Sequence, residues 1–234
     1  LGVISIYMLI SYMAFSNARR SEQNKVWTGM ARETAHQIGT PLSALLGWIA
    51  YLKERYPAEI AFKEMERDVD RLSSITERFS KIGSRPELTD TDLSGTLQHT
   101  VDYLSTRMGK KVSFEQDISL GLLAKHNPQL LSWVIENLVK NATDAVEGSG
   151  VIRLTASPLE DSINIIVHDS GKGIPLKIQR NIFKPGFTTK NRGWGLGLSL
   201  ARRIIEEYHN GSIALVESGS EKGTTFKIVL PAAL

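Results

Sequence analysis

The sequence contains no cysteine among its 234 residues. This absence excludes disulfide bonds, thiolate metal sites and cysteine nucleophiles, whereas the length suffices for one or two domains with a hydrophobic core. The formal net charge is only +3, and no basic run alternates with aromatic residues as in a nucleic-acid groove. We therefore expect no nucleic-acid partner.

The sequence also lacks an apolar run that could cross a membrane by itself. Residues 1–16, LGVISIYMLISYMAFS, would span only ~24 Å as a helix, short of the ~30 Å hydrocarbon core. Arg19 and Arg20 follow directly, which favours a cytoplasmic location for the rest. We interpret residues 1–17 as the end of a transmembrane helix of the cell (inner) membrane that begins upstream, and 18–25 as a juxtamembrane linker. A buried or interfacial helix is the alternative.

Two helical patterns occupy residues 26–85. Small and apolar residues recur at helical spacing from Trp27 to Leu52 and again from Met65 to Ile82, with Pro57 in the turn between them. This pattern predicts a helical hairpin. Because one hairpin cannot bury both apolar seams, we expect two copies to form a dimeric four-helix bundle.

A polar linker over 86–91 separates the hairpin from a mixed α/β region over 92–234. There we predict helices over 93–108, 128–147 and 197–209, and strands over 111–116, 150–157, 162–169, 211–217 and 224–231. Asn127 and Pro128 form the start of the second helix, and Gly148 follows its end. A loop of about 20 residues from Gly171 is long enough to be a functional lid.

Polar residues lie beside the apolar face of the helix over 128–147. Asn137, Asn141 and Asp144 follow one another at helical spacing. Such groups need partners if they are buried, and carboxamide oxygens suit Mg²⁺. Taken alone, the pattern favours side chains that simply face water or cap a neighbouring loop.

The strand over 162–169 ends in Asp169, which shares its side with the apolar residues of that strand. A carboxylate there is costly unless it accepts specific hydrogen bonds. Gly171 and Gly173 follow at once and permit a close backbone approach. The alternative is a tight turn with a solvated aspartate.

Three glycines at a spacing of two, Gly193, Gly195 and Gly197, open the helix over 197–209. A helix start with free N–H groups is suited to phosphate. The sequence contains neither a G-x-x-x-x-G-K-[ST] loop nor a complete dinucleotide-binding G-x-G-x-x-G.

In this order, the three motifs resemble the Bergerat ATP-binding fold of sensor histidine kinases, gyrase-type ATPases and Hsp90. The resemblance spans roughly residues 88–234. It implies an α+β chain, in which the dimeric hairpin precedes an α/β sandwich over 92–234. It also implies ATP and Mg²⁺ as cofactors.

The resemblance further implies roles for individual residues. Asn141 would bind Mg²⁺, Asn137 would lie near the phosphates, and Asp169 would accept the adenine amino group. The remaining positions of the motifs are Gly171 and Gly173 after the aspartate, Phe183, Phe187 and Lys190 in the lid, Gly193, Gly195 and Gly197 at the helix start, and Gly223 with Thr224 in the closing motif. Asp144 departs from the family, in which many members have a lysine; Lys140 or Lys190 could take that lysine's place.

The stretch HQIGTPL, residues 36–42, resembles the histidine motif of the same kinases. Pro41 removes a backbone hydrogen bond just beyond His36 and should bend the helix there. Thr40 lies one turn from His36 on the same face. The resemblance implies autophosphorylation of His36, transfer to an aspartate of a response regulator receiver domain, and a role for Thr40 in dephosphorylation of that regulator.

Gln37 stands where the family usually has an acidic residue. Its amide can orient the imidazole but cannot act as a base, so we expect Gln37→Glu to speed autophosphorylation. Two other functions stay open: a Bergerat-type ATPase in which Glu136 activates water, and a scaffold that binds nucleotide without turnover. ATP hydrolysis without labelling of the protein would identify the first, and binding alone the second.

Overall fold

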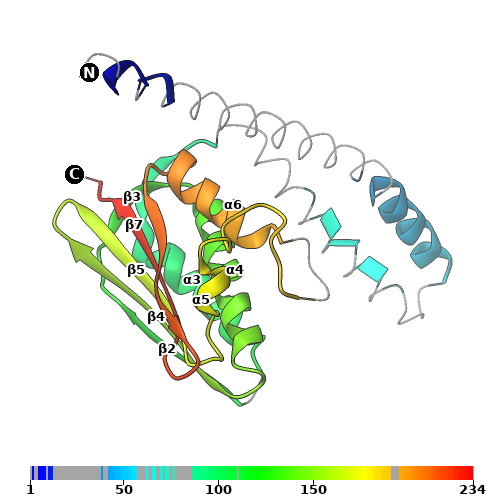
Figure 1. Ribbon diagram of the computed structural model, residues 1–234. Helices are drawn as coiled ribbons and strands as arrows, with labels where there is room; N and C mark the ends of the chain where they lie inside the picture. Colours follow the sequence, from blue (N-terminus) through cyan, green and yellow to red (C-terminus); the bar gives the residue numbers. More distant parts are fainter. Residues whose placement is uncertain are drawn as a thin grey trace. The chain divides into compact units, whose positions relative to one another are not determined.

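The chain divides into two compact units, residues 1–86 and 87–234 (Figure 1). The computed structural model describes residues 2, 5–8, 10–12, 38, 42–56, 62, 65–66, 69–70, 72–73, 76, 86–109, 111–190 and 195–233. His36, Gln37, Thr40 and Gly193 lie outside these residues, so their predicted roles are not tested here. Within the described part of the chain, no helix combines the length and apolar character needed to span a membrane.

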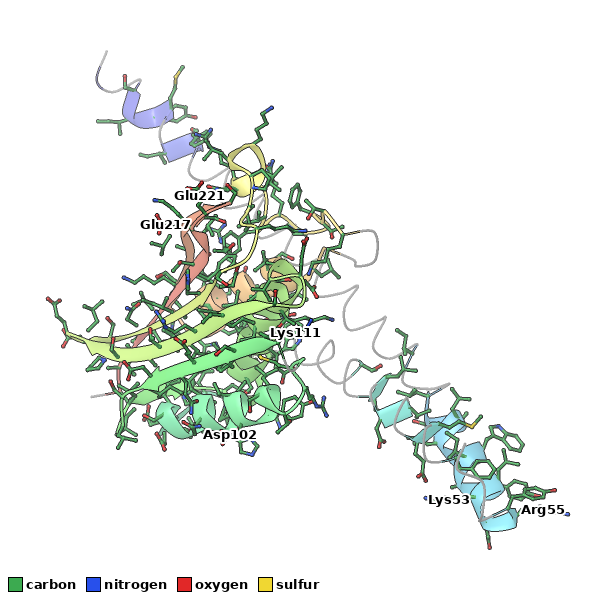
Figure 2. The ribbon with its side chains drawn as sticks, turned by 90° about the horizontal axis from the view of Figure 1, so that it is seen from below. Lys53, Arg55, Asp102, Lys111, Glu217 and Glu221 are labelled. Atoms are coloured by element: carbon green, nitrogen blue, oxygen red, sulfur yellow. The ribbon has the colours of Figure 1, made fainter. Side chains whose placement is uncertain are left out.

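In the first unit, residues 42–55 form a helix, and the described residues between 62 and 76 are also helical. Leu42 and Ile49 pack with Val69 in a small buried cluster. Lys53, labelled in Figure 2, donates a 2.7 Å hydrogen bond from Nζ to Glu66. These contacts join the two stretches that the sequence pattern assigns to separate helices.

The second unit contains a mixed five-stranded sheet with strand order β2-β4-β5-β7-β6. Only β2 and β4 pair in parallel; the other neighbours are antiparallel. The strands are β2 (Val112–Ile118), β4 (Gly150–Leu159), β5 (Ser162–Asp169), β6 (Ser212–Gly219) and β7 (Gly223–Pro231). Helices cover one face of this sheet (Figure 1). They are α3 (Leu93–Ser105), α4 (Pro128–Ala145) and α6 (Gly197–Arg203).

Helix α4 forms the centre of the core. Its apolar residues from Leu130 to Ala142 are buried against the sheet and against α3 and α6. The predicted start is confirmed, because the Asn127 side chain accepts a 3.1 Å hydrogen bond from the Leu130 N–H and Pro128 is the first helical residue. Gly148, with φ of +94°, follows the end of the helix.

Two short strands were not predicted. Thr89–Asp92, most of which we assigned to the linker, forms β1 and pairs antiparallel with β3 (Leu123–His126) in a separate two-stranded sheet. Strands of four residues are too short to show a clear alternation of apolar and polar side chains. Their pairing depends on a tertiary partner rather than on local pattern.

Two helical segments also differ from expectation. The helix predicted over 197–209 is α-helical only to Arg203 and continues as a π-helical turn, η1 (Ile204–Tyr208). In this turn the His209 N–H donates to the Ile204 carbonyl, five residues back, at 3.1 Å. The loop from Gly171 contains one helical turn, α5 (Leu176–Gln179).

Candidate functional site

Asp169 lies at the end of β5, where the strand enters the core. Its side chain is only 4% exposed, on the same face as the buried Ile163, Ile165 and Val167. The Gly171 N–H donates to its Oδ1 at 2.9 Å. Burial raises the pKa of the carboxyl group, and hydrogen bonds from Gly171 and Thr224 oppose that rise. The predicted inward orientation is confirmed.

The backbone of β7 begins very close to the backbone of Asp169. Gly223 has φ of +64°, and a Cβ at this position would lie 1.7 Å from the Asp169 carbonyl oxygen. No other residue type fits there without moving one of the two strands. Thr224 is buried next to it, and its hydroxyl lies 3.1 Å from the Ser218 hydroxyl. Gly223 and Thr224 therefore form one wall beside Asp169.

The turn after Asp169 is attached to the end of α4. The Lys172 N–H donates to the Ala145 carbonyl at 3.2 Å, and a Cβ on Gly171 would meet the Ala145 backbone at 2.5 Å. Gly173 follows with φ of +70°. This contact brings the glycine turn next to the helix that carries Asn137 and Asn141.

Asn137 faces the start of α6. The absent side chain of Gly197 leaves room for its Oδ1, which would lie 3.2 Å from a Cβ there. Its Nδ2 is buried and has no hydrogen-bond partner among the described residues. A buried amide donor without a partner is costly, so this atom is suited to an acceptor other than the described residues.

Residues 180–190, here called the lid segment, pack their aromatic rings against the domain. The rings of Phe183 and Phe226 meet edge to face at 6.1 Å, and the Arg202 guanidinium lies 5.3 Å from the centre of the Phe183 ring. Phe187 packs against the core. The Gly186 N–H donates to the Gly195 carbonyl at 3.1 Å, next to the start of α6.

Lys190 ends the described lid segment and contacts α4 directly. Its Nζ donates to Asn141 Oδ1 at 2.9 Å and to Asp144 Oδ2 at 2.5 Å. The resemblance made Lys190 a candidate to take the place of the lysine that many family members have at the position of Asp144. The structure brings Lys190 to Asn141 and Asp144, each of which lies more than forty residues before it in the sequence.

His209 was not singled out from the sequence. Its side chain is 2% exposed, with Nδ1 2.8 Å from the Ile204 carbonyl and Nε2 accepting from the Asn127 N–H at 3.0 Å. These partners require a neutral ring that carries its proton on Nδ1. Burial lowers the pKa of His209, and nearby His126 lowers it further. A single histidine at the end of a predicted helix has no neighbouring motif, so the sequence does not indicate its contact with Asn127.

Comparisons with known proteins agree with this geometry. Residues 126–234 match the family described as histidine kinase-, DNA gyrase B-, and HSP90-like ATPase. The sensor histidine kinase ZraS of Escherichia coli strain K12 is 33% identical over 223 residues, which cover 91% of this chain and 47% of ZraS. The chain thus spans about half the length of the curated relatives that it matches.

Two solved structures are also similar. The catalytic domain of histidine kinase ThkA is 30% identical with a TM-score of 0.57, over 62% of this chain and 96% of that domain. A structure of ThkA in complex with the response regulator protein TrrA matches 95% of this chain and 66% of that one, with a TM-score of 0.60 and 24% identity. The chain belongs to the sensor histidine kinases, and its second unit is the α+β ATP-binding domain of that family.

Proposed function

We propose that the chain transfers the γ-phosphoryl group of ATP to His36 and then to an aspartate of a response regulator receiver domain. The observation that carries the nucleotide part is the buried Asp169 carboxylate, which accepts backbone hydrogen bonds from Gly171 and Thr224 next to the glycine turn that contacts α4. An ionised carboxylate accepts about four hydrogen bonds, and Gly171 and Thr224 supply two backbone donors. Capacity therefore remains for the amino group of adenine.

The other side chains also fit the nucleotide and its metal. Asn137 Nδ2 is a buried donor without a partner among the described residues, as a site for phosphate oxygens requires. Asn141 Oδ1 faces the Lys190 ammonium and is therefore oriented toward positive charge. Asn141 would bind Mg²⁺, which neutralises the charge that develops on the phosphates during transfer.

The remaining chemistry belongs to His36. Its neutral imidazole attacks the γ-phosphorus, the bond to the bridging oxygen breaks, and ADP leaves with the electron pair. The imidazolium proton passes to water, while Gln37 orients the ring without removing that proton. The receiver aspartate then attacks the phosphohistidine, and Thr40 positions water for later hydrolysis of the phosphoaspartate. The complex of the relative ThkA with the response regulator TrrA supports this choice of partner.

The first unit supports a dimeric hairpin. The cluster of Leu42, Ile49 and Val69 joins its two helical stretches, yet Trp48 and Tyr51 remain 64% and 52% exposed. A second copy that covers these rings would complete a four-helix bundle in a homodimer. We further propose that residues 1–17 attach the protein to the inner membrane and that the two units lie in the cytoplasm.

Labelling with γ-labelled ATP and Mg²⁺ tests the kinase function. We expect an acid-labile, base-stable label on the protein that is absent from His36→Ala and retained by His99→Ala, which changes an exposed histidine on α3. ATP hydrolysis without labelling would replace the kinase with the ATPase function. Nucleotide binding with neither label nor hydrolysis would identify a scaffold.

Gln37→Glu tests the role of the residue that follows His36. A carboxylate can accept the imidazole proton during attack, and general-base assistance typically contributes 10²–10⁴-fold. We expect a faster initial rate of labelling at equal ATP occupancy. An unchanged rate would show that the acidic residue is dispensable in this chain.

A further inference from the structure

The Lys190 ammonium binds two oxygens on one side of α4. Asn141 and Asp144 are three residues apart, so both side chains project from the same side of the helix. Lys190 Nζ lies 2.9 Å from Asn141 Oδ1 and 2.5 Å from Asp144 Oδ2. The lid segment is thereby tied to the helix that lines the nucleotide site.

This contact occupies an atom that the proposed function needs. Asn141 Oδ1 would be the metal ligand, and an ammonium group and a divalent cation on the same oxygen disfavour each other because the two positive charges repel. Release of Lys190 from Asn141 therefore favours binding of the metal there. Its released ammonium would then be free to approach the phosphates.

We propose that Asp144 is a positioning residue that holds Lys190 of the lid segment on Asn141 while the nucleotide site is empty. The inference rests on the proposed nucleotide site and adds a step to its use: the contact opens when the nucleotide and its metal bind. Asp144 acts through Lys190 and does not itself contact the nucleotide.

The carboxylate is the stronger of the two contacts, because a charged acceptor binds an ammonium group more tightly than a neutral carboxamide does. The pair is nevertheless half exposed, with side-chain exposures of 43% for Lys190 and 47% for Asp144. Ion pairs with this exposure shift an equilibrium by about two- to five-fold. The contact between Lys190 and Asp144 therefore favours the position of the lid segment against α4, but it breaks at a small cost in free energy.

Hydrogen exchange of the nucleotide-free full chain tests the contact itself. We expect backbone amides of residues 186–190 to exchange about two- to five-fold faster in Asp144→Asn than in the original chain, and Asp144→Glu to restore slow exchange. Glu115→Gln is the matched control, because it removes a similarly exposed 2.6 Å ion pair with Arg153. Equal exchange in Asp144→Asn and the original chain would overturn the proposal.

Calorimetric binding of AMPPNP with Mg²⁺ tests whether Asp144 acts through Lys190. We expect Asp144→Asn to tighten binding by about two- to five-fold, because Lys190 is then held less strongly on α4 and costs less free energy to release. In a Lys190→Gln background the same substitution should have no effect. Equal tightening in both backgrounds would mean that Asp144 merely repels the phosphates, and it would overturn the proposal.

The two measurements also separate this inference from the proposed function. If the full chain binds no nucleotide, the proposed function fails, whereas the exchange of residues 186–190 still reports the contact between Lys190 and Asp144. If nucleotide binds but neither exchange nor affinity depends on Asp144, the nucleotide site stands and the positioning role is wrong.

Discussion

The two ends of the candidate site are built differently. At the end formed by β5 and β7, Asp169 is buried and Gly223 leaves no room for a side chain. At the end formed by the lid segment and α4, Lys190 and Asp144 are half exposed and held by an ion pair. The first end is fixed by steric exclusion and burial, whereas the second is held by polar contacts that water can replace.

This difference fits the proposed function, in which one end of the site binds the base and the other binds the phosphates and their metal. A base is recognised by a donor and an acceptor at fixed positions, and a preformed pocket for it lowers the cost of binding. The phosphates and their metal have to enter, react and leave, which requires contacts that open at little cost.

The largest effect is expected at Gly223. Gly223→Ala would place a methyl group 1.7 Å from the Asp169 carbonyl oxygen at φ of +64°, so the two strands must separate. We expect a loss of about 3 kcal/mol or more in the free energy of unfolding, measured by urea denaturation. Gly219→Ala, in the same hairpin but with nothing within 4 Å of the added Cβ, should change it little. Similar losses in both variants would show that this end is not sterically fixed.

Asp169→Asn should separate binding from stability. The substitution removes the charged acceptor that we propose for the adenine amino group, and we expect AMPPNP affinity to fall about 10- to 100-fold. The pKa of Asp169 is raised in the folded protein. The stabilisation linked to this carboxyl group is therefore present at a pH below its pKa in the unfolded chain, and it is lost as the pH rises through its pKa in the folded protein. The variant should therefore be no less stable than the original chain at neutral pH. A large loss of stability would contradict this account.

A smaller effect is expected from His209, which holds the start of α4. Its pKa in the folded protein lies below the ordinary value of 6.5. As pH falls below 6.5, the unfolded chain binds a proton that the folded ring resists, and stability is lost down to the lowered pKa. Urea denaturation from pH 7.5 to 5.5 should show a steeper decline for the original chain than for His209→Gln. Parallel curves would mean that this ring does not titrate as its contacts require.

The smallest effect on stability is expected at the lid segment. Lys190→Gln removes a half-exposed ion pair with Asp144 and an exposed hydrogen bond to Asn141, so the free energy of unfolding should change by about 1 kcal/mol or less. Urea denaturation with Lys222→Gln as a control, which loses a more exposed pair with Glu217, should give a change that is no larger. A loss as large as that of Gly223→Ala would remove the distinction between the two ends.

Long elements with clear periodicity were predicted well. The cap at Asn127, the buried face of α4 and the inward side of β5 follow from patterns that local sequence contains. The β1–β3 pair and the π-helical turn before His209 could not be predicted from local patterns. Each involves a partner distant in the sequence: β1 pairs with β3, and His209 contacts Asn127. The roles of His36, Gln37, Thr40 and Gly193 stay predictions, since these residues lie outside the described structure.

The family, the order of the motifs and the residue types that could bind a nucleotide are all evident in the printed sequence, since they depend on spacing along the chain. The distances between those residues follow from the folded arrangement alone. This arrangement places Gly223 against Asp169 and Lys190 on Asn141 and Asp144. The physical reason is that steric exclusion and ion pairing act over a few ångströms in space, and sheet pairing and lid packing, rather than sequence distance, set those separations.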